Sequence, residues 1–524
     1  MIRTLLLATL LLNACVQGNA QSVNEVIWFW SGAVTPTSAK VNAKLTSASN
    51  QVKLVVSTSP NFSGTVFTSS AAVADANNSR VAALSISGLS PDTKYYYCIE
   101  ADGVRDLSTD DIGEFKTFKD GPYSFLFAPA ACVLDSDNEV YDEIRQMNPL
   151  FYLCMGDLHY SDPNSNNISV HRDPYETVHS KAPATNLFRK LPLAYVWDDH
   201  DYCGNNGAGN ALPGTGNARQ VYREFVPHYD LPAGSGNQPI YQSFKVGRIR
   251  FILTDLRSER TTGSMMGTAQ KAWFKNEVLA AKQNNEFIAW VTSVSWAGDE
   301  SDNWGGFTAE REELANFFRD QNIQNMLLLS GDAHMVAIDN GNNMDFSTGQ
   351  NNPNKYPMLQ AAAVTNIGSD KGGTYSEGGT FTNALFTGQF GTVNVTDDGN
   401  QICFELKGYR RNFITNSLST LATYQFCRTM PFITGISPNL PPLNCRVFPN
   451  PSKGKFALQI QESATGKAAI QVLDTQGKEV LNLLTDVTAG TWEESIDLSS
   501  FAKGTYLLQV TFSGKTYQTK LIRE

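Results

Sequence analysis

Positive charge and long apolar runs are both scarce in this sequence. Its 524 residues include 41 Lys and Arg against 51 Asp and Glu, a formal net charge of −10. Proteins that bind nucleic acid present a basic face, so we expect no nucleic-acid partner. The apolar run LLLATLLL near the N-terminus is too short to cross a bilayer, and no later run is long enough, so we expect no transmembrane segment.

Two familiar catalytic patterns are also missing. We find no Ser-His-Asp arrangement for nucleophilic catalysis, and no glycine-rich loop of the kind that cradles phosphates. If the protein is a hydrolase, its catalytic residues must therefore belong to another kind of motif, and the acidic motifs are the candidates.

Three short acidic motifs each follow an apolar run. They are GDLHY (156–160) after FYLCM, WDDHDY (197–202) after LAYV, and SGDAHM (330–335) after MLLL. Short apolar runs closed by polar residues indicate buried parallel strands, and ligands of such sheets bind beyond the carboxyl ends of the strands. Oxygen-rich sites with a few imidazoles suit divalent and trivalent metals. The candidate residues are Asp157, Tyr160, Asp198, Asp199, His200, Asp332 and His334.

A fourth strand end adds a cysteine. YSFLF (123–127) runs into APAACV, which places Cys132 in the same layer. Cys132 is either a small buried apolar residue, as most free cysteines are, or a thiolate ligand to a metal such as iron. Position alone leaves both readings open.

The order of these segments resembles the PhoD-type alkaline phosphatases, which belong to the calcineurin-like metallophosphoesterases. The resemblance covers about residues 23–430 and is carried by Cys132, the three acidic motifs, DLRSER (255–260) and TAQKAWF (268–274). It implies an α/β fold, the metallophosphatase αββα sandwich of two sheets between helices.

The resemblance also implies a metal set. It assigns Fe³⁺ to Cys132, Asp157 and Tyr160. It assigns Ca²⁺ to aspartates, an asparagine and the late Asp-His motif, which here are Asp157 (shared with iron), Asp199, Asn206, Asp332 and His334, with Asp198 as a further candidate. One departure is visible, because the family's Asp-His-Glu reads Asp-His-Asp at residues 199–201; the acidic character is retained.

Two small β-sandwich domains are expected to flank the catalytic part. Residues 23–119 have short alternating runs and resemble a fibronectin-III-like domain, followed by the catalytic domain at 122–430 and a proline-rich linker at 431–444. Residues 445–524 resemble the C-terminal sorting domain of type IX secretion; the alternative is a carbohydrate-binding sandwich.

Sequence features at both ends of the chain predict that the protein is exported. Residues 1–20 are typical of a cleaved signal peptide, with a lipoprotein cleavage box ending at Cys15 as the alternative. With the sorting domain, this predicts a protein secreted or attached to the cell surface, with the type IX machinery as partner. Export permits disulfides, and Cys403 and Cys427, which flank a hairpin-like stretch, are the best candidate pair.

These features predict a metal-dependent phosphoester hydrolase for small mono- or diesters. Metals neutralise phosphate oxygens and lower the pKa of bound water, so hydroxide would attack near neutral pH; the acidic chain itself gives a phosphate no long-range attraction. We assign catalytic roles to Asp157, to His200 as general acid, and to Arg257, beside Arg260, as a phosphate clamp. Such arginines more often pair with carboxylates.

Two alternative functions stay open. One is a phospholipase-D-like or nucleotide-directed phosphodiesterase that uses the same metals. The other is a surface binding protein with a vestigial phosphatase site, which the two flanking sandwiches would suit.

Overall fold

The computed structural model describes residues 24–108, 112–349, 352–430, 444–462, 464–474, 479–512 and 515–524. The chain divides into two compact units between Met430 and Pro431. The predicted signal peptide and, apart from Asn444, the predicted linker lie outside the described residues. The domain bounds expected from the sequence stay predictions.

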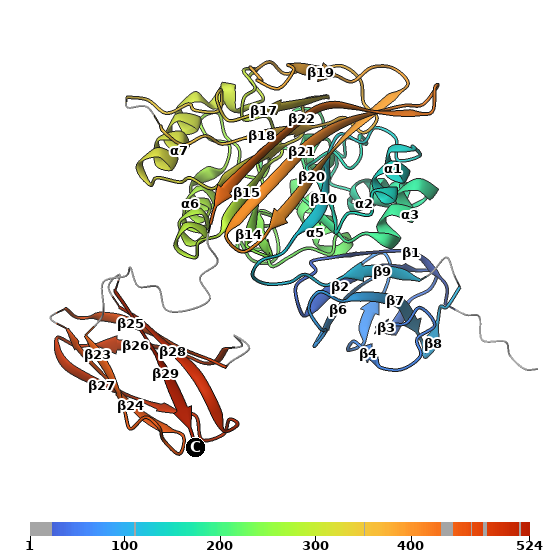
Figure 1. Ribbon diagram of the computed structural model, residues 1–524. Helices are drawn as coiled ribbons and strands as arrows, with labels where there is room; N and C mark the ends of the chain where they lie inside the picture. The colour runs from blue at the N-terminus through green and yellow to red at the C-terminus, as the bar shows by residue number, and fades with distance from the viewer. Residues whose placement is uncertain are drawn as a thin grey trace, which may run out of the picture. The chain divides into compact units, whose positions relative to one another are not determined.

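A nine-stranded sheet forms one layer of the first unit (Figure 1). Its strands, in spatial order, are β22 (Ser417–Thr429), β21 (Gln401–Asn412), β20 (Thr387–Asp397), β10 (Phe125–Ala130), β11 (Tyr152–Cys154), β12 (Leu193–Tyr195), β1 (Val26–Gly32), β2 (Ser38–Leu45) and β6 (Val81–Ser87). β10, β11 and β12 are parallel, with Ala130 beside Cys154 and Cys154 beside Tyr195.

A seven-stranded sheet forms the second layer. Its order is β13 (Gln242–Val246), β14 (Ile249–Thr254), β15 (Phe287–Thr292), β16 (Met326–Ser330), β18 (Met358–Ala361), β17 (Met335–Asp339) and β19 (Thr380–Thr382). β14, β15, β16 and β18 run parallel, so their carboxyl ends share one edge of the sheet.

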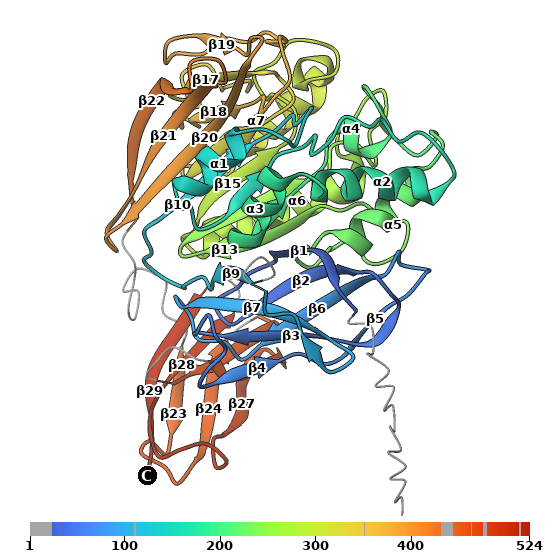
Figure 2. The ribbon, with the colours of Figure 1, turned by 90° about the vertical axis from the view of Figure 1, so that its right-hand side faces the viewer.

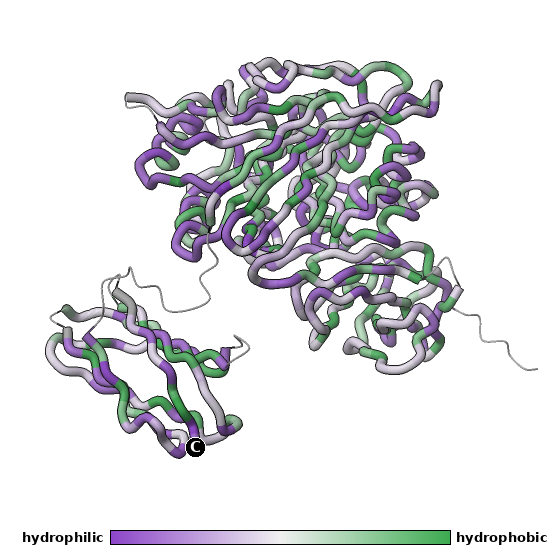
Figure 3. Tube along the Cα trace, viewed as in Figure 1, coloured by the Kyte–Doolittle hydropathy of each residue, from purple (hydrophilic) through white to green (hydrophobic). Residues whose placement is uncertain are grey.

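Alternate residues of the parallel strands pack into different layers. On β14, Phe251 and Leu253 join the core shared with the nine-stranded sheet, whereas Ile252 packs in the core formed with two helices, α6 (Gly267–Gln283) and α7 (Thr308–Asp320). Both faces are buried, which explains why these strands are continuous apolar runs. The same runs appear as apolar tube segments in the interior of the unit (Figure 3).

Helices cover the outer faces of both sheets. α6 and α7 lie against the seven-stranded sheet, and the other helices lie on the far side of the sandwich (Figures 1 and 2). These are α1 (Val140–Gln146), α2 (Ile168–His179), α3 (Ala182–Lys190), the short α4 (Asp199–Tyr202) and α5 (Thr215–Phe225). The predicted αββα sandwich is confirmed.

The N-terminal strands continue the nine-stranded sheet. β1, β2 and β6 form one of two β-layers in the N-terminal part, and β1 pairs in parallel with β12, with Gly32 beside Leu193. A Cβ at Gly32 would lie 2.7 Å from the Leu193 carbonyl oxygen, so this approach requires glycine. The other layer contains β3 (Ser49–Ser57), β4 (Val66–Thr68), β5 (Ala72–Ala74), β7 (Lys94–Ala101), β8 (Val104–Arg105) and β9 (Gly113–Lys116).

The second unit is a separate β-sandwich with its own apolar core. One sheet holds β23 (Cys445–Phe448), β24 (Lys455–Glu462) and β27 (Gly490–Asp497); the other holds β26 (Glu479–Val487), β25 (Gly466–Leu473), β28 (Gly504–Phe512) and β29 (Lys515–Arg523). In the first unit, Cys403 and Cys427 form the expected disulfide across β21 and β22. Within the described parts of the chain, no helix is both long and apolar enough to cross a membrane.

Candidate metal centre

The three acidic motifs meet because their strands end at the same edge of the sandwich. GDLHY follows β11, WDDHDY follows β12 and SGDAHM follows β16. Main-chain hydrogen bonds join the ends. Cys132 N donates to Gly156 O over 3.1 Å, and Val133 N donates to Asp157 O over 2.8 Å. Gly331 N donates to Ser293 O over 3.0 Å, which ties the end of β16 to that of β15.

Three of the strand-end residues adopt left-handed backbone conformations. φ is +62° at Cys132, +53° at Asp157 and +61° at Asp332. Asp tolerates this region better than most residues, but Cys seldom adopts it. Each such residue costs on the order of 1 kcal/mol, and outliers of this kind gather where function requires a particular side-chain direction.

The glycines of these motifs allow the strands to approach closely. A Cβ on Gly156, whose φ is +115°, would lie 2.6 Å from the Asp198 Cβ. A Cβ on Gly331 would lie 2.5 Å from the Ala131 Cβ. Real Cβ atoms do not come this close, so both positions exclude larger residues. The glycine of each Gly-Asp pair is what permits its aspartate to enter the site.

Three buried carboxylate oxygens in this region have no hydrogen-bond partner. They are Asp157 Oδ1, Asp199 Oδ1 and Asp332 Oδ2. Ligand atoms of Asp157, Asp199 and His200 lie within 4.8 Å of one another, as do those of Asp198, Asp199 and Asp332. We call these five residues the acidic centre. Buried charged oxygens without partners are costly unless they bind cations, so this donor set fits metal ions.

The pKa values of the buried aspartates also favour metal binding. Burial, and then the charges of Asp199 and Asp198, raise the pKa of Asp157 well above its usual range. Burial and the charge of Asp198 do the same for Asp332. Burial also opposes ionisation of Asp199, but Arg257 and His200 outweigh it and lower its pKa. The protein alone disfavours full ionisation of the acidic centre, and bound cations would reverse that.

Tyr160, His334 and Cys132 lie beside the acidic centre. The Tyr160 hydroxyl donates to Asp157 Oδ2 over 3.0 Å and lies 3.0 Å from His334 Nε2. The other His334 nitrogen, Nδ1, lies 3.0 Å from the Ile367 carbonyl oxygen. Cys132 is fully buried; burial and the charge of Asp157 raise the pKa of its thiol well above the ordinary value. Cys132 is in neither of the two close groups.

His200 and Asn206 lie on the solvent side of this region. His200 Nδ1 is 2.6 Å from Asp162 Oδ1, and the ring packs against Tyr160 with centroids 4.0 Å apart. Because Nδ1 is occupied by Asp162, Nε2 is the ring nitrogen that could protonate a leaving group or coordinate a metal. Asn206 contacts Asp199 through its main chain, whose N–H donates to Oδ2 over 2.6 Å, and the residue is exposed. A metal-ligand role for its side chain stays a prediction.

Arg257 directs its donors at carboxylates. Its guanidinium bonds both oxygens of Asp198, one over 3.0 Å, and both oxygens of Asp302, over 3.0 and 2.9 Å. Arg257 and Asp198 are fully buried, and Ser293 Oγ donates to Asp198 Oδ1 over 2.9 Å. Arg260 bonds Asp302 Oδ1 over 2.6 Å. This is the carboxylate pairing named above as the more frequent role; the phosphate-clamp role stays untested.

Sequence reasoning missed four residues that complete the site. Asp302 accepts hydrogen bonds from Arg257, and Ser293 donates one to Asp198. Asp162 contacts His200 Nδ1. Lys371 Nζ lies 3.7 Å from Asp332 Oδ1. All four lie in loops rather than in the acidic motifs, and the segments around them carry no spacing that distinguishes them from surface turns.

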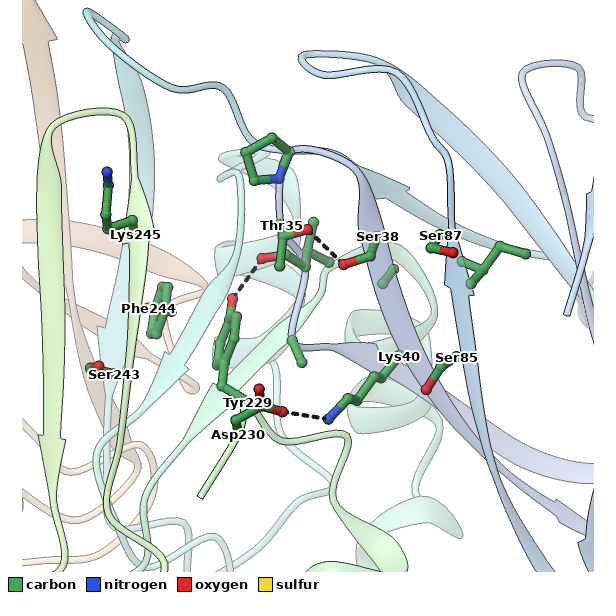
Figure 4. Close-up of a pocket in the computed structure, with 15 residues that line it drawn as sticks. Thr35, Ser38, Lys40, Ser85, Ser87, Tyr229, Asp230, Ser243, Phe244 and Lys245 are labelled. Carbon is green, nitrogen blue, oxygen red and sulfur yellow. Dashed lines mark hydrogen bonds and ion pairs between the residues drawn. The ribbon is translucent and has the colours of Figure 1, made fainter. Parts of the chain in front are cut away.

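A pocket of about 450 Å³ lies between the N-terminal strands and β13 (Figure 4). Several of its polar groups pair with one another: Thr35 with Ser38 over 2.6 Å, and Lys40 with Asp230 over 3.7 Å. Tyr229 donates to the Val34 carbonyl oxygen over 2.9 Å. None of its lining residues belongs to the acidic centre, so we assign it no function.

Comparison with known proteins agrees with this geometry. Residues 135–385 match the PhoD-like phosphatase family, and residues 446–524 match the secretion system C-terminal sorting domain. Alkaline phosphatase D of Bacillus subtilis (strain 168) is 26% identical over 184 residues, which is 28% of this chain and 31% of that protein. The match therefore spans about a third of that relative.

A solved structure of PhoD shares the fold. It aligns over 78% of this chain and 90% of its own, with a TM-score of 0.62 and 17% sequence identity. At that identity the likeness supports the fold alone. The sorting domain indicates export by type IX secretion, and release or attachment at the cell surface. Residues 135–385 are therefore a PhoD-like phosphatase domain, and residues 446–524 are a type IX secretion sorting domain.

Proposed function

We propose that the chain is an exported, metal-dependent hydrolase of small phosphate mono- and diesters. The observation that carries the proposal is the set of three buried carboxylate oxygens that accept no hydrogen bond, at three different strand ends; Asp199 Oδ1 has only the Arg257 guanidinium, 3.6 Å away. A phosphatase domain without metals would leave these oxygens unsatisfied, whereas cations would satisfy them and supply the positive charge that an ester phosphate needs.

We assign the metals as follows. Cys132, Asp157 and Tyr160 would hold Fe³⁺, since a thiolate and a phenolate suit it better than Ca²⁺. Asp199, Asp332 and His334, with Asp198 and Asn206, would hold Ca²⁺, shared with Asp157. When bound, these ions would neutralise phosphate oxygens and make water a stronger nucleophile at neutral pH.

The protein's own groups have distinct proposed roles. His200, oriented by Asp162, would donate a proton from Nε2 to the leaving oxygen. Arg257 would act as a positioning residue, because its hydrogen bonds hold Asp198 and Asp302 in place and leave little donor capacity for substrate. We thus favour this role over the phosphate clamp.

Metal analysis and an absorption spectrum of the purified enzyme test the proposal. We expect iron and calcium, a visible charge-transfer band, and hydrolysis of p-nitrophenyl phosphate that chelation abolishes. Cys132→Ser should bleach or shift the band and lower activity. A colourless enzyme that is fully active with zinc would contradict the iron assignment, and a metal-free protein that hydrolyses no ester would support a vestigial site.

A further inference from the structure

Lys371 lies beside the acidic centre with its charge incompletely paired. Its Nζ is 3.7 Å from Asp332 Oδ1 and 3.9 Å from Glu300 Oε2. Both distances are longer than a hydrogen bond, and Nζ donates no hydrogen bond to any residue that the structure describes. Arg257 differs, because its donors form four hydrogen bonds to two carboxylates. Lys371 therefore keeps ammonium hydrogens for a ligand.

The loop that carries Lys371 holds it firmly in this position. Lys371 itself has a left-handed φ of +54°, and its carbonyl oxygen accepts from Asp299 N over 3.3 Å. The next residue is Gly372, where a Cβ would meet Asp299 Oδ1 at 1.8 Å. The same loop orients His334, whose N donates to the Ser369 carbonyl oxygen over 2.7 Å. One loop thus aims both a proposed metal ligand and an ammonium at the centre.

The exposures of Lys371 and its two acidic neighbours differ widely. The Asp332 side chain is 7% exposed and that of Glu300 is 55% exposed, with Lys371 between them at 17%. Lys371 therefore lies between the buried Asp332 and the exposed Glu300, at the boundary between the acidic centre and the surface. A chain with a net charge of −10 attracts no phosphate from a distance, so a local cation at this boundary has a clear use.

We propose that Lys371 binds a non-bridging oxygen of the substrate phosphate and favours monoesters over diesters. This inference rests on the proposed function. A monoester dianion has three non-bridging oxygens and a diester monoanion has two. A charged hydrogen bond to the additional oxygen would favour the monoester by about ten- to hundredfold.

The test compares Lys371→Met and Lys371→Arg in the metal-loaded full chain. For Lys371→Met we expect kcat/KM for p-nitrophenyl phosphate to fall about ten- to hundredfold, mostly through KM, and that for bis-p-nitrophenyl phosphate to fall less than about threefold. Calorimetric titration with inorganic phosphate should show a similar weakening. Lys371→Arg should recover much of the loss, because it keeps the charge.

Lys271→Met is a matched control. The Lys271 side chain is 23% exposed and bonds Glu313 over 2.7 Å, away from the acidic centre. It should leave both substrates unchanged. Metal content and melting temperature should match the wild type in all three variants.

Several results would overturn the assignment. Equal losses on both esters, or loss of metal in Lys371→Met, would mean that Lys371 acts through Asp332 and not on substrate. Unchanged kinetics would also overturn it. If the wild type hydrolyses neither ester, the proposed function fails, and the phosphate titration still decides: weaker binding by Lys371→Met supports the phosphate contact, and equal binding refutes it.

Discussion

Replacement of Arg257 by methionine should destabilise the first unit strongly and in a pH-dependent way. Arg257 is fully buried and forms four hydrogen bonds to Asp198 and Asp302, whose side chains are 0% and 14% exposed. Methionine fills similar space but carries no charge. The substitution therefore leaves two carboxylates without their principal counter-charge.

Two limits set the size of the effect. Breaking a buried ion pair by removing one partner costs about 3–5 kcal/mol. A carboxyl can avoid that cost by binding a proton, which from an unfolded pKa of about 3.9 costs about 4 kcal/mol at pH 7. Both limits agree, so we expect a loss of about 3–5 kcal/mol in the free energy of unfolding at pH 7.

The loss should shrink as the pH falls. In the wild type, burial opposes ionisation of Asp302, but Arg257 and Arg260 outweigh it and lower the pKa. The stabilisation that the ionised Asp302 carboxylate gains from the two arginines is present above the unfolded pKa of about 3.9, and it is lost as the pH falls through the folded pKa. In the variant Asp302 keeps its bond to Arg260, but the fully buried Asp198 loses Arg257, which opposes the effect of burial on its pKa. The pKa of Asp198 should therefore rise, and its protonation costs only about 1.5 kcal/mol at pH 5. The difference in the free energy of unfolding between the wild type and Arg257→Met should therefore shrink by about 2–3 kcal/mol between pH 7 and pH 5.

Urea denaturation followed by tryptophan fluorescence measures this difference. Trp492 is the only tryptophan beyond residue 430, so the signal reports mainly the first unit. Arg145→Met is the control, because Arg145 is 39% exposed and pairs with Asp142 within one helix, and it should cost less than about 0.5 kcal/mol. A loss below about 1 kcal/mol for Arg257→Met, or one that does not change with pH, would refute the reasoning.

Three further predictions concern the site and the domains. Gly156→Ala should lower metal content and activity at least tenfold, because its Cβ would meet Asp198 at 2.6 Å. Gly88→Ala is the control for backbone strain alone, since Gly88 has a φ of +79° and nothing lies within 4 Å of its added Cβ. Equal effects of the two substitutions would contradict the steric argument. His200→Ala should slow hydrolysis of an alkyl phosphate by about 10²–10⁴-fold and that of p-nitrophenyl phosphate far less, with metal content unchanged. Equal losses would mean that His200 binds substrate, and lost metal would make it a ligand. Truncation after Met430 should leave hydrolysis intact in vitro and block release from the cell, since the second unit has its own core; inactivity of the truncated protein would place that unit in the catalytic fold.

Local pattern was sufficient to locate the strand ends and the residues that follow them. A strand buried on both faces must be continuously apolar, and a Gly-Asp pair closes such a run at β11 and β16. Parallel strands bring these ends to one edge, so Asp157, Asp199 and Asp332 were predictable as neighbours. The cysteine pair at 403 and 427 was predictable for a similar reason, because a hairpin aligns residues on its two strands.

Tertiary structure alone decided the loops and the ion pairs. Lys371 reaches the acidic centre because its loop is tied to Asp299 and His334, and no periodicity encodes such a contact. The partners of Arg257 are 59 and 45 residues away, so its pairing depends on how the strands pack. The pairing of β1 with β12 requires glycine at position 32, because a Cβ there would clash with the Leu193 carbonyl oxygen. That clash is evident only once the two strands are placed side by side. Sequence patterns specify what one strand or helix buries, whereas contacts between distant loops depend on the whole fold.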